Sequence, residues 1–191
     1  MISRKFPFDF SAFPELESER LRLRELLPED VSAIIKHFGN AEVVKFIEMQ
    51  PVRTQEQANE WLRWMGDFYA SQDGVRWAIE RKSDGQFVGS AGLHHWSREH
   101  HYAEIGYDIT SQYWGEGYAT EVARTIVEFA WQALKLNRIE ADVMQGNIAS
   151  MRVLEKLGFQ REGILRQRVN KGGKYFDVYL FSLLRDDYQG S

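Results

Sequence analysis

The segment from residue 102 to residue 144 is the part of the chain that most restricts its fold. Residues 102–109 alternate in the manner of a strand, and a loop with two glycines follows at 114–119. Apolar side chains then recur at helical spacing as far as Leu134, and a second strand is predicted at 138–144. A strand, a helix and a parallel strand in this order form a right-handed crossover. The segment therefore indicates an α/β fold.

The elements on either side of this unit complete one α/β domain of the α+β type. We predict a mixed, mostly antiparallel sheet of about seven strands, with helices on both faces and a parallel pair at 102–109 and 138–144. Residues 1–18 are expected to be an irregular N-terminal lead-in, and residues 19–188 the folded domain. The other predicted strands are 20–26, 75–79, 87–93, 159–168 and 175–184, and the other helices are 28–38, 54–72 and 147–157.

Composition excludes several classes of protein. The 191 residues contain no cysteine, so a disulfide framework, a thiolate metal site and a cysteine nucleophile are ruled out. With 24 basic and 28 acidic residues the net charge is −4, which argues against a nucleic-acid binder. No apolar run is long enough for a membrane helix, and Pro7 and Asp9 interrupt any secretory signal. A soluble cytoplasmic protein is expected.

The glycine loop at 114–119 is a candidate phosphate-binding element. Gly115 and Gly117 allow a ligand to approach the backbone closely, and the loop leads into a helix N-terminus with free N–H groups. No Gly-Lys-Ser/Thr follows, and Thr120 occupies the third glycine position of a dinucleotide fingerprint. A loop that merely joins a strand to a helix, or another kind of nucleotide-binding module, remains open on this evidence.

Three segments together resemble a known family. They are Glu-Ile-Gly-Tyr at 104–107, Trp-Gly-Glu-Gly-Tyr-Ala-Thr-Glu at 114–121, and the run 147–159, which contains Asn-Ile-Ala-Ser and Leu-Glu-Lys-Leu-Gly-Phe. In this order and spacing they are similar to the GNAT acetyltransferases. Within that superfamily they resemble the ribosomal-protein N-terminal acetyltransferases of the RimJ/RimL type. The resemblance implies a GNAT fold, in which the parallel pair 102–109 and 138–144 is splayed at the cofactor site. It also implies acetyl-CoA as co-substrate.

The resemblance also implies specific cofactor contacts. The pyrophosphate loop of the family, Gln/Arg-x-x-Gly-x-Gly/Ala, matches residues 114–119, although Trp114 departs from Gln/Arg and a register that starts at Gln112 also fits. The strand before the loop presents backbone groups to the pantetheine arm, and the Asn-x-x-Ser motif contacts that arm near the sulfur. The expected cofactor-binding residues are Tyr107, Asp108, Ile109, Trp114, Gly115, Glu116, Gly117, Tyr118, Ala119, Thr120, Asn147 and Ser150.

Two residues are candidates for the chemistry of acyl transfer, which needs a donor for the leaving sulfur and a base for the amine proton. Ser150 is the candidate donor, and its structural alternative is a first-turn residue behind an N-cap at Asn147. Glu104 is the candidate base, and its alternative is a carboxylate at the sheet surface. Some members of the branch carry a glutamate base in the strand after the Asn-x-x-Ser helix, where this chain has Val169.

The sequence does not predict a metal site. Histidines occur in two pairs, 94–95 and 100–101, but no His-Glu-x-x-His or other ligand spacing accompanies them. Ser150 and Glu104 are therefore expected to work without a metal.

These features favour an N-acetyltransferase that transfers the acetyl group directly in a ternary complex. The resemblance to the RimJ/RimL branch implies a protein N-terminal α-amine as the leading acceptor, for example that of a ribosomal protein. A small amine or an aminoglycoside is the alternative. A CoA-binding sensor without catalysis is the alternative of another class, and Val169 is its best support. A monomer or homodimer is expected, with no direct nucleic-acid or membrane partner.

Overall fold

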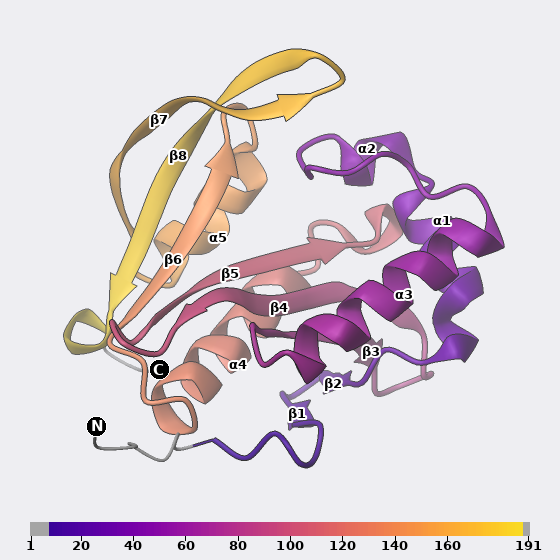
Figure 1. Cartoon of the computed structure of the whole chain (residues 1–191), viewed down its shortest axis with the longest axis horizontal. Coiled ribbons are helices and arrows are strands. Elements are labelled where there is room, and N and C mark those ends of the chain that lie inside the picture. The colour runs from indigo at the N-terminus through magenta and orange to yellow at the C-terminus, as the bar shows by residue number, and fades with distance from the viewer. Residues whose placement is uncertain (1–7, 189–191) are drawn as a thin grey trace.

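An eight-stranded sheet runs through the structure, a computed structural model that describes residues 8–188 (Figure 1). The strand order is β1-β2-β3-β4-β5-β6-β8-β7, and every neighbouring pair is antiparallel except β5 and β6. This confirms the predicted fold class. The strands are β1 (Leu16–Glu17), β2 (Leu21–Arg24), β3 (Val75–Arg81), β4 (Phe87–Ser97), β5 (Tyr102–Ile109), β6 (Arg138–Met144), β7 (Gln160–Lys171) and β8 (Lys174–Leu184).

The additional strand lies in the segment expected to be irregular. Residues 1–7 of that segment are outside the described part, but Leu16 and Glu17 form β1 and pair with β2. Pro14 accepts a hydrogen bond of 2.6 Å from the indole Nε1 of the buried Trp77. The sequence pattern missed this strand because two residues are too few to show a period of two.

Helices cover both faces of the sheet, as predicted. In Figure 1, α3 lies in front of β3 and β4, whereas α4 lies behind β4 and β5. Thr54 caps α3, since its hydroxyl accepts a hydrogen bond of 3.2 Å from the Gln57 N–H. In return, the side-chain oxygen of Gln57 accepts a hydrogen bond from the Thr54 N–H. No helix in the described residues is long and apolar enough to cross a membrane. The helices are α1 (Val31–Phe38), α2 (Ala41–Val44), α3 (Gln55–Ala70), α4 (Tyr118–Gln132) and α5 (Ile148–Lys156), with short 3₁₀ turns η1 (Pro28–Asp30), η2 (Ser111–Tyr113) and η3 (Arg185–Asp187).

The parallel strands β5 and β6 separate along their length. They pair only from Tyr102↔Arg138 to Glu104↔Glu140, although β5 continues to Ile109 and β6 to Met144. Each strand stays paired with its outer neighbour over the remaining residues, β5 with β4 and β6 with β8. Backbone groups that face the gap therefore have no strand partner. The splay predicted from the sequence is present.

Candidate active site

A cleft of about 570 Å³ opens where β5 and β6 diverge. Its walls are the end of β5, the glycine loop, the first turns of α4 and α5, and residues of the segment 42–47. The structure brings most of the predicted cofactor residues to this cleft. These are Tyr107, Asp108, Ile109, Trp114, Gly115, Gly117, Tyr118, Ala119, Thr120, Asn147 and Ser150.

The glycine loop presents the start of α4 to the cleft. Gly117 is the N-cap of the helix and has φ of +83°, and Gly115 has the same left-handed φ, a conformation that favours glycine. A Cβ added at Gly115 would meet no atom within 4 Å. The first N–H groups of a helix have no intrahelical acceptor, and the dipole there is positive. The loop is thus a suitable site for a phosphate group.

Arg20 holds this loop from outside the cleft. Its Nε donates to Glu121 Oε2 at 2.7 Å, its Nη1 donates to the Glu116 carbonyl at 3.0 Å, and its guanidinium lies 4.4 Å from the ring centre of Tyr118. Burial raises the pKa of Glu121, but hydrogen bonds from Ser18 and Arg20 outweigh it, so the pKa is lowered. Glu116 therefore supports the loop through its carbonyl and does not line the cleft. The contact between Arg20 and Glu121 could not be predicted from local sequence patterns, because the two residues are 101 positions apart.

Trp114 also fixes the loop. Its indole Nε1 donates a hydrogen bond of 2.6 Å to the carbonyl of Ile109, at the end of β5. The side chain is still half exposed and lines the cleft. The pattern that the loop resembles has Gln or Arg at this position. Here the tryptophan connects the loop to β5 by a hydrogen bond. The carbonyl of Ile109, which was expected to face the cofactor, is the acceptor of that bond.

The carboxylate of Asp108 points away from the cleft, so only the backbone of this residue is available there. Oδ1 lies 2.6 Å from His37 Nε2 and accepts from Ser90 N–H at 3.0 Å, while Oδ2 pairs with Arg76. Burial raises the pKa of Asp108, but the charge of Arg76 and hydrogen bonds from His37 and Ser90 outweigh it and lower the pKa. The side chain anchors the end of β5 to α1 and β3.

Asn147 and Ser150 lie at the start of α5. Asn147 is the N-cap, and its Oδ1 accepts a hydrogen bond of 3.2 Å from the Ser150 N–H. The Ser150 hydroxyl lies 3.1 Å from the hydroxyl of Tyr107, which reaches it from β5 across the splay. Burial raises the pKa of Tyr107, so its phenol remains protonated. Sequence reasoning assigned only the backbone of Tyr107; its hydroxyl forms a pair with Ser150.

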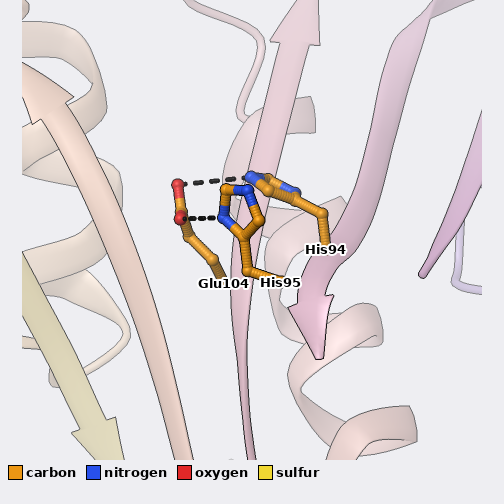
Figure 2. Close-up of side chains that lie close together, drawn as sticks. All are labelled: His94, His95 and Glu104. Carbon is orange, nitrogen blue, oxygen red and sulfur yellow. Dashed lines mark hydrogen bonds and ion pairs between the residues drawn. The ribbon is translucent and has the colours of Figure 1, made fainter. Parts of the chain in front are cut away.

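Glu104 lies outside the cleft lining, earlier on β5. Its Oε1 is 3.2 Å from His94 Nε2 and its Oε2 is 2.9 Å from His95 Nδ1 (Figure 2). Burial raises the pKa of Glu104, but the hydrogen bonds and charge of the two histidines outweigh it, so the pKa is lowered. Glu104 is therefore a carboxylate at neutral pH and only a weak base.

The cleft fits acetyl-CoA. Its slot between β5 and β6 exposes unpaired backbone groups to an extended amide chain, and its glycine loop offers N–H groups to phosphates. Three basic side chains line it as well, which suits an anionic molecule. They are Lys45, Arg152 and Lys156.

Comparison with known proteins agrees with this geometry. Residues 20–160 match the family model described as an acetyltransferase (GNAT) domain. The chain is 38% identical over 173 residues to uncharacterized N-acetyltransferase YoaA of Bacillus subtilis (strain 168), which covers 91% of this chain and 98% of that protein.

Two solved structures share the fold. One is RimJ of Mycobacterium smegmatis in complex with CoA-disulfide, with a TM-score of 0.82, 23% identity and coverage of 90% of this chain and 85% of that one. The other is spermidine N-acetyltransferase from Vibrio cholerae in complex with CoA and spermine, with a TM-score of 0.79, 21% identity and coverage of 91% and 100%. The chain therefore belongs to the GNAT family of acetyltransferases and is an N-acetyltransferase.

Proposed function

We propose that this protein transfers the acetyl group of acetyl-CoA directly to the N-terminal α-amine of a protein, as ribosomal-protein acetyltransferases do. The observation that carries the proposal is the cleft between β5 and β6, which has a phosphate-binding loop on one side and the Ser150–Tyr107 hydroxyl pair on the other. A carboxylate, Glu104, lies on the strand that leads into it. The resemblance of the motifs at 104–107, 114–121 and 147–159 to ribosomal-protein N-terminal acetyltransferases supports this acceptor class.

Each step of the acyl transfer can be assigned to particular groups in the cleft or beside it. Thioester and amine are held in the gap of the sheet, where an N–H near Tyr107 or Asp108 can donate to the oxygen that gains charge during acyl transfer. The Ser150 hydroxyl, held by Tyr107, can donate to the sulfur as it leaves. Glu104 can accept the amine proton directly or through water. An α-amine has a pKa of about 7.7–8.0, so a weak base is sufficient.

Replacing Ser150 with alanine is expected to lower kcat roughly tenfold, with a smaller increase in the KM for acetyl-CoA. The reason is that general acid catalysis contributes about 10²–10⁴-fold, and Tyr107 remains to replace part of the donor. Both constants are measured from the release of free CoA, which is detected with a thiol reagent. Tyr107→Phe in the same background should lower kcat further. A wild-type kcat in Ser150→Ala would remove this residue from the chemistry.

Replacing Glu104 with glutamine is expected to lower the rate roughly tenfold near pH 7 and much less above pH 8. Below its pKa the amine is mostly protonated and needs the base, whereas at higher pH it is already neutral. Glu140→Gln is the matched control, because Glu140 is the β6 partner of Glu104 and is bound by Arg138. Parallel pH profiles for the wild type and Glu104→Gln would exclude Glu104 as the base.

The acceptor class is tested by a panel of peptides with free N-termini, polyamines and aminoglycosides. Turnover on peptides, but not on their N-terminally blocked forms, is expected. Preferential turnover of a polyamine or an aminoglycoside would instead establish a small-molecule acceptor; the fold shared with spermidine N-acetyltransferase keeps that alternative open.

A CoA-binding sensor is the alternative of another class. Val169 is buried among Met144 and Val178, so no carboxylate base is present at that position. Tight acetyl-CoA binding without turnover on any acceptor would favour the sensor, and stabilisation by ATP or NAD but not by CoA would favour a nucleotide-binding module.

A further inference from the structure

Two histidines and a glutamate converge between β4 and β5, outside the lining of the cleft. Figure 2 shows the rings of His94 and His95 directed at the two oxygens of the Glu104 carboxylate. Their ligand atoms lie within 4.8 Å of one another. Within residues 8–188, this is the single group of three or more histidine or acidic side chains that comes so close. The arrangement needs a physical explanation, because the two histidines are consecutive in the sequence.

Consecutive residues of a regular strand point to opposite faces of the sheet. The pairing of β4 with β5 passes from His94↔Glu104 to Ser97↔Tyr102, which leaves one more residue on β4 than on β5. This interval is a β-bulge, and His95 within it has φ of +51°. The bulge brings His95 to the carboxylate that His94 already faces. The cost is a left-handed backbone conformation that is uncommon for a residue with a side chain.

A hydrogen bond alone is a weak explanation for this conformation. The His95 side chain is 70% exposed, and ion pairs so open to water contribute little to stability. A positive φ also occurs at Gln72, His101, Lys135 and Gln167, so the backbone conformation alone does not indicate a site. At His95 it directs the side chain to a group that already holds a histidine and a carboxylate. We propose that His94, His95 and Glu104 bind a divalent transition-metal ion, with Zn²⁺ as the best match; in the ion-bound protein Glu104 is a ligand and does not serve as the base.

The donor set suits zinc in kind and in spacing. Two imidazole nitrogens and one carboxylate oxygen form a known class of zinc site, in which water takes the fourth position. Bonds of about 2.0–2.2 Å in a tetrahedron place ligand atoms roughly 3.3–3.5 Å apart. His94 Nε2 lies 3.2 Å from Oε1 and His95 Nδ1 lies 2.9 Å from Oε2, so the two contacts involve different carboxylate oxygens at hydrogen-bond distance. Rotation of the carboxylate and of the exposed His95 ring would place one oxygen and both nitrogens around an ion. Mg²⁺ and Ca²⁺ prefer sites made of oxygen alone.

The test is direct metal binding by tag-free, full-length protein that has been treated with a chelator and freed of it. Calorimetry with ZnCl₂ should give one ion per chain, and Co²⁺ should give the intense visible absorption of a four-coordinate site. An excess of Mg²⁺ should not displace either ion. Because binding is measured directly, the result holds whether or not the protein acetylates any acceptor.

Variants separate this site from other histidines. His94→Ala, His95→Gly and Glu104→Gln should each weaken zinc binding at least about tenfold, since each removes a ligand. His95→Gly is the most informative, because glycine accepts the positive φ and the fold should be retained. The matched control is His100→Ala with His101→Ala, which removes two exposed histidines of the same hairpin and should leave zinc affinity unchanged.

Two results would overturn the proposal. The first is the absence of stoichiometric zinc binding at micromolar concentrations of metal. The second is equal zinc affinity in the wild type and in folded His95→Gly, which would show that the ion binds elsewhere and that the three side chains form only a hydrogen-bonded group.

Discussion

Gly117→Glu is expected to abolish detectable CoA binding while the protein remains folded. The substitution places a carboxylate at the N-cap of α4, where the amide groups and dipole are suited to an anion. It also forces a side chain into a backbone with φ of +83°. We expect the Kd for CoA to increase at least about a hundredfold, because repulsion and steric blockage act on the same phosphates. Calorimetric titration with CoA measures this change.

Gly172→Glu is the matched control for Gly117→Glu. Gly172 has φ of +59°, has open space around its Cβ position, and lies in the turn between β7 and β8, outside the cleft lining. Its substitution carries the same charge and a similar backbone strain, so the two variants should have similar melting temperatures. Gly172→Glu should bind CoA as the wild type does. If Gly117→Glu also bound CoA normally, the phosphate site could not be at this loop.

Asp108→Asn is expected to destabilise the protein by about 3–5 kcal/mol at pH 7, the usual cost of removing one partner from a buried ion pair. The Asp108 carboxylate is 5% exposed and is the counter-charge of Arg76 as well as the partner of His37. Asparagine keeps the shape but leaves Arg76 without a buried anion. The free energy of unfolding, from urea titrations at pH 7, checks this value.

The stability difference between the wild type and Asp108→Asn depends on pH, and its direction follows from the pKa of Asp108. The folded-state pKa of Asp108 is lowered, so it lies below the unfolded value of about 3.9. Its contribution to stability is therefore present above about pH 4 and is lost as the pH falls through the folded-state pKa. The stability curves of wild type and Asp108→Asn should converge in acid. Asp84→Asn, at an exposed pair with Arg81, should have little effect at any pH. A constant difference between wild type and Asp108→Asn down to pH 2 would contradict the assignment.

Local patterns were sufficient to predict the longer helices and strands and the glycine loop on one side of the cleft. A helix start, a left-handed glycine and an N-cap are decided by residues within one or two turns of each other. The sequence thus predicted the α4 start at the glycine loop and the cap at Asn147. The separation of β5 from β6 was expected from the resemblance to the family. The cofactor loop followed because its residues are contiguous in the chain.

The contacts that complete the site depend on tertiary structure. Arg20 meets Glu121, and His37 meets Asp108, because β2 and α1 pack beside residues that are far away in sequence. The Tyr107–Ser150 pair likewise forms across the gap between β5 and α5. The periodicity of neighbouring residues carries no information on contacts between distant segments. Sequence reasoning therefore placed Asp108 in the cleft lining but did not predict that its side chain pairs with His37 and Arg76.

His94 and His95 show most clearly which features the sequence predicts and which depend on tertiary structure. The sequence by itself determined the strand, glycine loop and helix of the central unit, because these rest on periodicity and on contiguous residues, and its three motifs carried the resemblance to the acetyltransferases. It predicted no metal site, because His94 and His95 have no ligand spacing along the chain. Only the register of β4 against β5, and the bulge at His95, bring the two rings to Glu104. Which side chains meet is decided by strand register and packing, and these are properties of the whole sheet.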